Sequence, residues 1–147
     1  MTVICRAAGL TDLSELTAFA KAKHQESNWA FLAFNAQWFR GCVKKALYDQ
    51  DQCVLITRRN GVLCGLLIGM CTSMLFTPLR CATDQVYVAD SGGDLLMREF
   101  RVWCKSKRVK RLDMGNSQAE RKGADRFMRR HGLQRAGSMY FYNEVDA

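Results

Sequence analysis

The fold of this chain is decided by Val86-Tyr87-Val88-Ala89-Asp90-Ser91-Gly92-Gly93-Asp94-Leu95-Leu96. A short apolar run leads through two glycines into helix-forming residues, which predicts a strand, a tight turn and a helix that ends near Lys107. A strand that enters a helix in this way points free backbone N–H groups at whatever lies above the strand end, and such groups bind phosphate well. The stretch therefore predicts an anion site at a helix start.

A second strand–helix unit follows the first. Residues 111–116 predict a short strand, and residues 124–131 predict a helix that Gly132 ends as its C′ residue. Toward the N-terminus, the Asn60-Gly61 pair predicts a tight hairpin, and the near-continuous apolar run 62–73 predicts a strand in the centre of a sheet. The other expected elements are strands at 3–7, 53–57, 85–89 and 138–145, helices at 11–23 and 35–48, and a loop or irregular strand at 75–83.

The resulting order, β-α-α-β-β-β-α-β-α-β, predicts an α+β (mixed α/β) fold. Over nearly the whole chain this order resembles the GNAT superfamily of acyl-CoA N-acetyltransferases. The resemblance implies one domain over residues 1–147, with a central, mostly antiparallel twisted sheet of six to seven strands flanked by about four helices. It also implies acetyl-CoA as cofactor, and transfer of its acetyl group to a primary amine of a small molecule or a protein.

The expected cofactor loop departs from the family pattern. GNAT domains hold the CoA pyrophosphate with (Arg/Gln)-x-x-Gly-x-(Gly/Ala), whereas this chain has a shorter loop without the leading Arg or Gln. We expect the sheet to open after Tyr87-Val88-Ala89, so that the opening faces the loop. The resemblance assigns cofactor contacts there to Val88, Ala89, Ser91, Gly92 and Gly93. Alternatively, Ser91 is simply the N-cap of the helix, with Asp94 completing a capping-box variant.

The stretch Ala124-x-x-Phe127-x-x-x-x-Gly132-Leu133 is similar to a GNAT helix beside the cofactor, Ala-x-x-Phe-Tyr-x-x-x-Gly-Phe. The resemblance adds Asn116, Phe127 and Met128 to the cofactor contacts. Met128 replaces the family Tyr that serves the departing CoA thiolate, and Met has no proton to donate. Packing of the helix on the sheet explains the same apolar residues equally well.

Catalysis of this type requires a base for the amine and a donor for the thiolate. Asp84, Asp90 and Glu144 are the candidate bases, although carboxylates at strand ends are usually solvated turn residues. Tyr87 is the first candidate donor, with Tyr140 and Tyr142 as alternatives. The aromatic segment Trp29–Trp38 is either an acceptor pocket or, as we favour, part of the core.

Charge and cysteine usage limit the remaining possibilities. Residues 98–135 hold 13 Lys and Arg against 4 Asp and Glu, a net charge of +9 in a chain whose total is +8. The excess of positive charge in residues 98–135 favours a polyphosphate partner, which can be CoA, a nucleotide or a nucleic acid. Nucleic-acid binding is therefore an alternative function, although no base-reading motif supports it. Seven cysteines without C-x-x-C spacing and two histidines predict no metal site and fit buried, reduced thiols.

The chain start shows no signal-peptide pattern, and the longest apolar stretch is too short to span a bilayer, so we expect a cytoplasmic protein without a membrane partner. Two further interpretations stay open. The chain is also similar to short, divergent GNAT-like proteins of tailed phages. A GNAT fold without catalysis, retained as a binding or structural module, fits the altered motifs as well.

Overall fold

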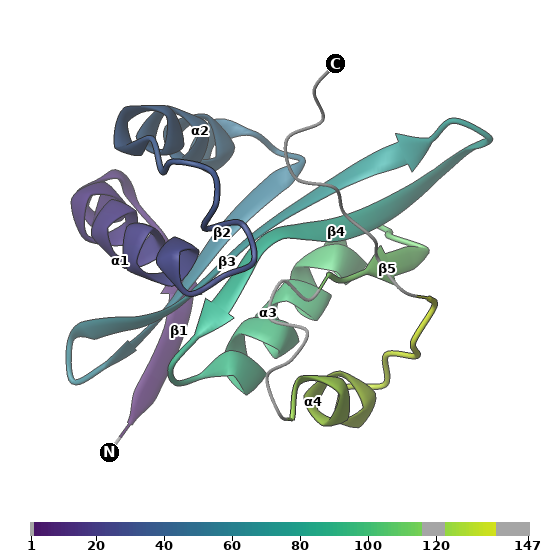
Figure 1. Cartoon of the computed structure of the whole chain (residues 1–147). Helices are drawn as coiled ribbons and strands as arrows, with labels where there is room; N and C mark the ends of the chain where they lie inside the picture. The colour runs from purple at the N-terminus through teal and green to yellow at the C-terminus, as the bar shows by residue number, and fades with distance from the viewer. Residues whose placement is uncertain (1, 116–122, 138–147) are drawn as a thin grey trace.

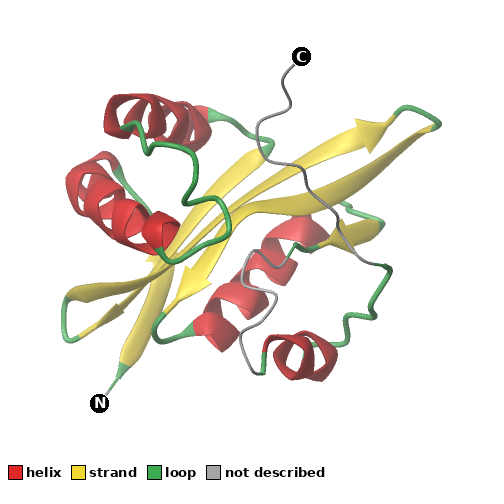
Figure 2. Cartoon of the chain, in the orientation of Figure 1, coloured by secondary structure: helices red, strands yellow, loops and turns green. Residues whose placement is uncertain are grey.

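One twisted sheet with helices on both faces forms the described part of the chain (Figure 1 and Figure 2). The computed structural model describes residues 2–115 and 123–137. The strands lie in sequence order in the sheet, and every neighbouring pair is antiparallel except β4 and β5, which are parallel. The strands are β1 (Val3–Ala7), β2 (Gln52–Arg59), β3 (Val62–Met74), β4 (Thr77–Ala89) and β5 (Arg111–Asp113). The helices are a 3-10 turn η1 (Leu10–Asp12), α1 (Leu13–Gln25), α2 (Ala36–Tyr48), α3 (Gly93–Ser106) and α4 (Ala124–Arg130).

This architecture confirms the predicted α+β class, with two corrections to the strands. The described residues contain five strands rather than six or seven, and the strand expected at 138–145 lies outside them. Of the two forms expected at 75–83, the irregular strand is confirmed and the loop is wrong, because β4 begins at Thr77 and pairs with β3 with a register shift near the turn. Pro78 is compatible with this long hairpin because it lies next to the hairpin end. In Figure 1 the hairpin extends beyond the rest of the sheet.

The side-chain alternation of the central strands builds two cores. Val54 and Ile56 of β2 face the layer of α1 and α2, whereas Cys53 and Leu55 face α3. Successive residues point to opposite faces of a sheet, so strands covered on both sides are apolar throughout. This explains the unbroken apolar run in β3. Figure 2 shows α1 and α2 on one side of the sheet, with α3 and α4 on the other.

Close packing fixes α3 against the sheet. Phe100 is fully buried, and a Cβ placed on Gly69 of β3 would lie 2.2 Å from its ring. Only glycine therefore allows the helix to lie this near to the strand. Since α3 begins at the end of β4, this contact also holds the start of α3 above the sheet.

The predicted hairpin turn forms, and α2 begins with a side-chain cap that the sequence pattern had not assigned. Asn60 and Gly61 take φ angles of 52° and 78°, as a tight primed hairpin turn requires. Asn35 caps α2 by accepting a 2.9 Å hydrogen bond from the Trp38 N–H. Trp38 itself is 74% exposed, and Trp29 and Phe31 are about half exposed, so the preferred core role of this aromatic segment is wrong for these side chains.

Candidate functional site

Strands β4 and β5 part at Asp84. β5 pairs only with Cys81–Thr83, so residues 84–89 have no strand partner on this edge within the described residues. The opening begins earlier than the predicted position after Ala89, because β5 has three residues and β4 carries a register shift that leaves Gln85 unpaired with β3. In a strand, alternate backbone N–H and C=O groups point toward each edge. The open edge of β4 is therefore a row of backbone donors and acceptors.

Asp84 lies where the two strands separate. One of its oxygens, Oδ1, accepts a 2.9 Å hydrogen bond from the Gly115 N–H and so bridges the gap beyond β5. Partial burial raises the pKa of the Asp84 carboxyl, and the Gly115 hydrogen bond opposes this shift. Asp84 thus has the environment of a base that holds its proton more tightly than an exposed aspartate.

Tyr87 links the same edge to the start of α3. Its hydroxyl donates a 2.9 Å hydrogen bond to the Gly93 carbonyl, and its ring packs against Phe127 of α4 with centroids 6.0 Å apart. Burial, followed by the nearby carboxylates of Asp94 and Asp84, raises the pKa of the Tyr87 phenol. The phenol is therefore a neutral hydrogen-bond donor, and it already has an acceptor.

The start of α3 has no side-chain cap. The N-cap is Gly92, in a left-handed conformation with φ of 81°. The N–H groups of Gly92, Gly93 and Asp94 donate to no acceptor among the described residues. These are the free donors at a helix start that the sequence predicted. The alternative capping box is wrong, since Ser91 is not the N-cap; its carbonyl instead accepts from the Thr57 hydroxyl at 2.9 Å.

The turn before α3 is pinned to the sheet. A Cβ on Gly92 would lie 2.8 Å from both Thr57 Cγ2 and Val3 Cγ1. A side chain at position 92 would therefore press into β1 and β2 rather than occupy the space above the helix start. Substitution of Gly92 is therefore expected to disturb folding, and a loss of ligand binding in such a variant would not identify an anion site.

Asp94 joins the start of α3 to the end of α4, a contact that sequence analysis missed. Its Oδ1 accepts hydrogen bonds from His131 Nε2 at 2.6 Å and Arg130 Nη2 at 2.8 Å. These bonds, the one from His131 first, hold the pKa of Asp94 below its ordinary value. Arg101 of α3 adds a 2.9 Å hydrogen bond to the His131 carbonyl. The acidic group that could repel a phosphate therefore has two cationic or polar partners.

The remaining predicted residues divide between the opening and other places. Phe127 and Met128 are half-buried on α4, and Phe127 lies between Tyr87 and His131. Ala89 packs with the α3 core, but Val88 packs with the α1–α2 core, so only its backbone lies at the open edge. The candidate base Asp90 forms a 2.5 Å ion pair with Lys23. The predicted residues outside the described part of the chain are Asn116, Tyr140, Tyr142 and Glu144.

No helix among the described residues combines the length and apolar character needed to cross a membrane. Within the same residues, no group of three or more His, Cys, Asp or Glu side chains is placed to hold a metal ion.

Known structures resemble the chain over almost its full length. A transcriptional regulator from Bacillus halodurans C-125 superposes with a TM-score of 0.77 at 14% identity, covering 97% of this chain and 99% of the other. A GCN5-related N-acetyltransferase from Ralstonia eutropha JMP134 superposes with a TM-score of 0.74 at 15% identity, covering 96% of this chain and 98% of the other. A ribosomal-protein-alanine N-acetyltransferase from Brucella melitensis superposes with a TM-score of 0.69 at 16% identity, covering 97% of this chain and 99% of the other.

Comparison by sequence gives no such relatives. No protein-family model and no curated protein matches the chain. The structural likeness nevertheless extends over nearly all of each chain, and the fold is that of the GNAT acetyltransferases.

Proposed function

We propose that this GNAT-fold chain, a single domain over residues 1–147, transfers an acetyl group from acetyl-CoA to a primary amine. The observation that carries the proposal is the open edge of β4 leading into an uncapped start of α3. In this arrangement one open strand edge leads directly to three N–H groups that have no acceptor among the described residues. The amine acceptor is a small molecule or a protein side chain.

The donor set suits CoA in two respects. The N–H groups of Gly92, Gly93 and Asp94 fit a pyrophosphate, because a helix start carries free donors and a positive dipole end. The open edge of β4 fits the amide groups of a pantetheine arm, as one strand fits another. Phe127 and Met128 would form an apolar wall beside it. When bound, the cofactor supplies an acetyl group already activated as a thioester.

The residues at the opening have separate chemical roles in this proposal. Asp84, with its raised pKa, takes the proton of the amine, directly or through water. Tyr87 donates its hydroxyl hydrogen bond to the departing thiolate after releasing the Gly93 carbonyl. Backbone N–H groups of β4 polarise the carbonyl under attack. Met128 contributes contact alone, because its thioether cannot donate a proton.

A second candidate is a GNAT-fold binding module without catalysis. The contacts between α3 and α4 favour it, since Tyr87 packs on Phe127 while Asp94 binds Arg130 and His131. Both contacts join the elements between which a cofactor would lie. An active enzyme must loosen them on binding, whereas a non-catalytic module has no need to.

Calorimetric titration of acetyl-CoA into the full chain separates the two candidates. Micromolar binding, followed by mass-spectrometric detection of an acetylated amine, supports the enzyme. Mass detection is needed because the exposed Cys42 reacts with the thiol reagents used to follow released CoA. Absence of binding at millimolar acetyl-CoA refutes the enzyme and leaves the binding module.

A further inference from the structure

The outer face of α3 carries a row of cations above a groove. Arg98, Arg101 and Lys105 are all exposed and recur at helical spacing, opposite the face that buries Phe100. The groove has a volume of about 460 Å³ and runs along α3 beside the end of α4. Its lining residues are Asp94, Arg98, Arg101, Val102, Lys105 and His131.

The acidic residues around this groove are already engaged or directed elsewhere. Asp94 pairs with Arg130 and His131, and on α4 Asp125 pairs with Arg129 at 2.8 Å. Glu99 is on α3 as well, but its charge acts on Cys5 of β1, on another side of the helix. The positive charges of Arg98, Arg101 and Lys105 are therefore not neutralised by these carboxylates and remain available to a partner.

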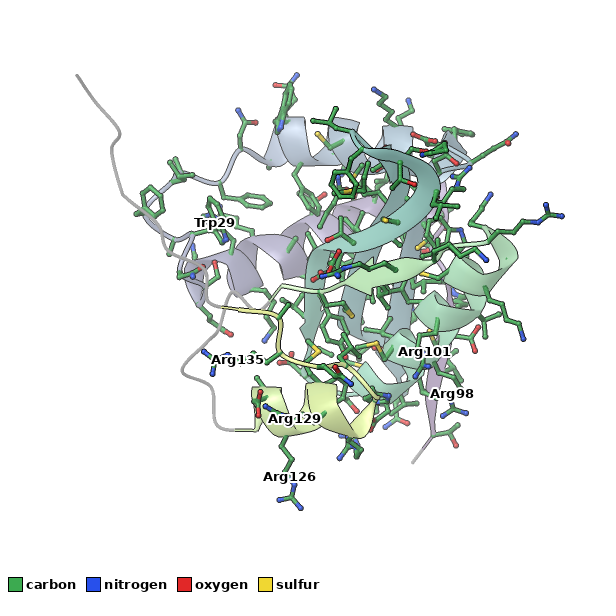
Figure 3. All side chains as sticks on the ribbon, turned by 90° about the vertical axis from the view of Figure 1, so that its right-hand side faces the viewer. Trp29, Arg98, Arg101, Arg126, Arg129 and Arg135 are labelled. Atoms are coloured by element: carbon green, nitrogen blue, oxygen red, sulfur yellow. The ribbon has the colours of Figure 1, made fainter. Side chains whose placement is uncertain are left out.

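Those cations form no ion pair within the described residues. Arg101 donates to a neutral acceptor, the His131 carbonyl, at 2.9 Å, and the structure gives Arg98 and Lys105 no hydrogen-bond acceptor among those residues. Figure 3 shows Arg98 and Arg101 on α3, with Arg126 on α4 in the same lower part of the molecule. Trp29 lies toward the opposite side in that view. The cations of α3 therefore lie on the same side of the molecule as α4.

The length of the row matches a chain of phosphates. From Arg98 to Lys105 a helix rises about 10 Å, at roughly 1.5 Å per residue. A nucleic-acid strand carries one charge about every 3.4 Å, so this length spans about three phosphates. The row runs away from the start of α3, to which the proposed function assigns the cofactor pyrophosphate.

We propose that this groove, defined by Arg98, Arg101 and Lys105, binds the phosphodiester backbone of a nucleic acid. The cations of the row are assigned to phosphates, which carry no sequence information, so we expect binding to be independent of sequence. The apolar face of α3 is buried against the sheet and Val102 is the single aliphatic residue of the lining, which disfavours a membrane as the partner. The groove shares Asp94 and His131 with the proposed cofactor site, but the three cations that define it have no role in the proposed acetyl transfer.

The test is fluorescence anisotropy of a labelled mixed-sequence oligonucleotide, titrated with the full chain at several salt concentrations. We expect a Kd of about 10⁻⁴–10⁻⁶ M at physiological salt. Changing Arg98, Arg101 and Lys105 together to Gln should weaken binding about ten-fold or more and reduce the slope of log K against log salt by about 2–3. Changing both arginines to Lys should preserve the slope.

The matched control changes Lys21, Lys44 and Lys45 to Gln. These exposed lysines of α1 and α2 lie on the other face of the sheet, and their loss reduces the net charge by the same amount. Circular dichroism verifies folding of each variant. The proposal is overturned if the control weakens binding equally, if wild-type protein does not bind at low salt, or if polyglutamate of equal charge competes as well as the oligonucleotide. Displacement of the oligonucleotide by acetyl-CoA at the Kd of the cofactor would also overturn it, because the cations would then serve the cofactor.

Discussion

Replacing Tyr87 by Phe separates the structural role of this residue from a chemical one. The change removes the hydroxyl that donates a 2.9 Å hydrogen bond to the Gly93 carbonyl, and it keeps the ring that packs on Phe127. A hydrogen bond of this kind contributes about 0.5–1.5 kcal/mol net. We therefore expect the free energy of unfolding to fall by about 1 kcal/mol, equivalent to a Tm lowered by about 2–4 °C.

The expected kinetic effect is much larger. A positioned proton donor contributes roughly 10²–10⁴ in rate. Even the lower value corresponds to about 2.7 kcal/mol of transition-state stabilisation, well above the structural loss. Because burial raises the pKa of the phenol, the hydroxyl stays protonated through the neutral range, so the loss should not depend on pH there.

Urea unfolding and single-turnover acetylation, the latter followed by mass spectrometry, measure the two effects on the same protein. Tyr48→Phe is the control, since this tyrosine is 69% exposed on α2, on the other face of the sheet. A Tyr87→Phe protein that loses about 1 kcal/mol of stability but keeps its rate refutes the donor role. A stability loss far above 1.5 kcal/mol would contradict the structural account of the hydrogen bond.

Three other changes test neighbouring parts of the argument. Asp94→Asn removes a negative charge from the start of α3, so calorimetry should show acetyl-CoA binding about two- to five-fold more tightly, the range for an exposed charge; unchanged affinity would place the pyrophosphate elsewhere. Arg6, with Gly9 and Arg58, holds the pKa of buried Asp12 far below its usual range, so stability present above about pH 4 should fall as the pH is lowered. Urea midpoints at neutral and acid pH measure this loss, and Asp12→Asn should reduce the pH dependence. In the Tyr87→Phe protein, where the native donor is gone, Met128→Tyr should raise the acetylation rate if α4 places this position beside the CoA sulfur, and a folded double variant with no gain would contradict that placement.

The sequence predicted what local patterns determine. The Asn60-Gly61 turn, the long apolar β3 and the helix from Ala36 follow from short-range periodicity and turn chemistry, and they form as expected. The first half of β4 was expected as either a loop or an irregular strand because Pro78 interrupts its pattern, and pairing with β3 decides for the strand. Local sequence therefore predicts the elements better than it predicts where a strand ends.

The site was less predictable because its contacts join residues far apart in the chain. Asp94 meets Arg130 and His131 across 36 and 37 positions, and Asp84 meets Gly115 across 31. No spacing rule relates such residues, since the fold alone brings them together. The same applies to Trp38, whose position on α2 suited the core although it faces outward.

The start of α3 is where the enzymatic and non-catalytic interpretations differ most. A side-chain N-cap contributes about 1 kcal/mol, and α2 has one in Asn35. α3 has none, although Ser91 is adjacent, and its first N–H groups have no acceptor within the described residues. A module maintained for stability alone would gain from a cap, whereas an anion that binds here needs these donors free. α1 and α4 lack a side-chain cap as well, so the missing cap leaves the start of α3 available to a ligand without requiring one. The bonds of Asp94 to Arg130 and His131 are the contacts that such a ligand must rearrange.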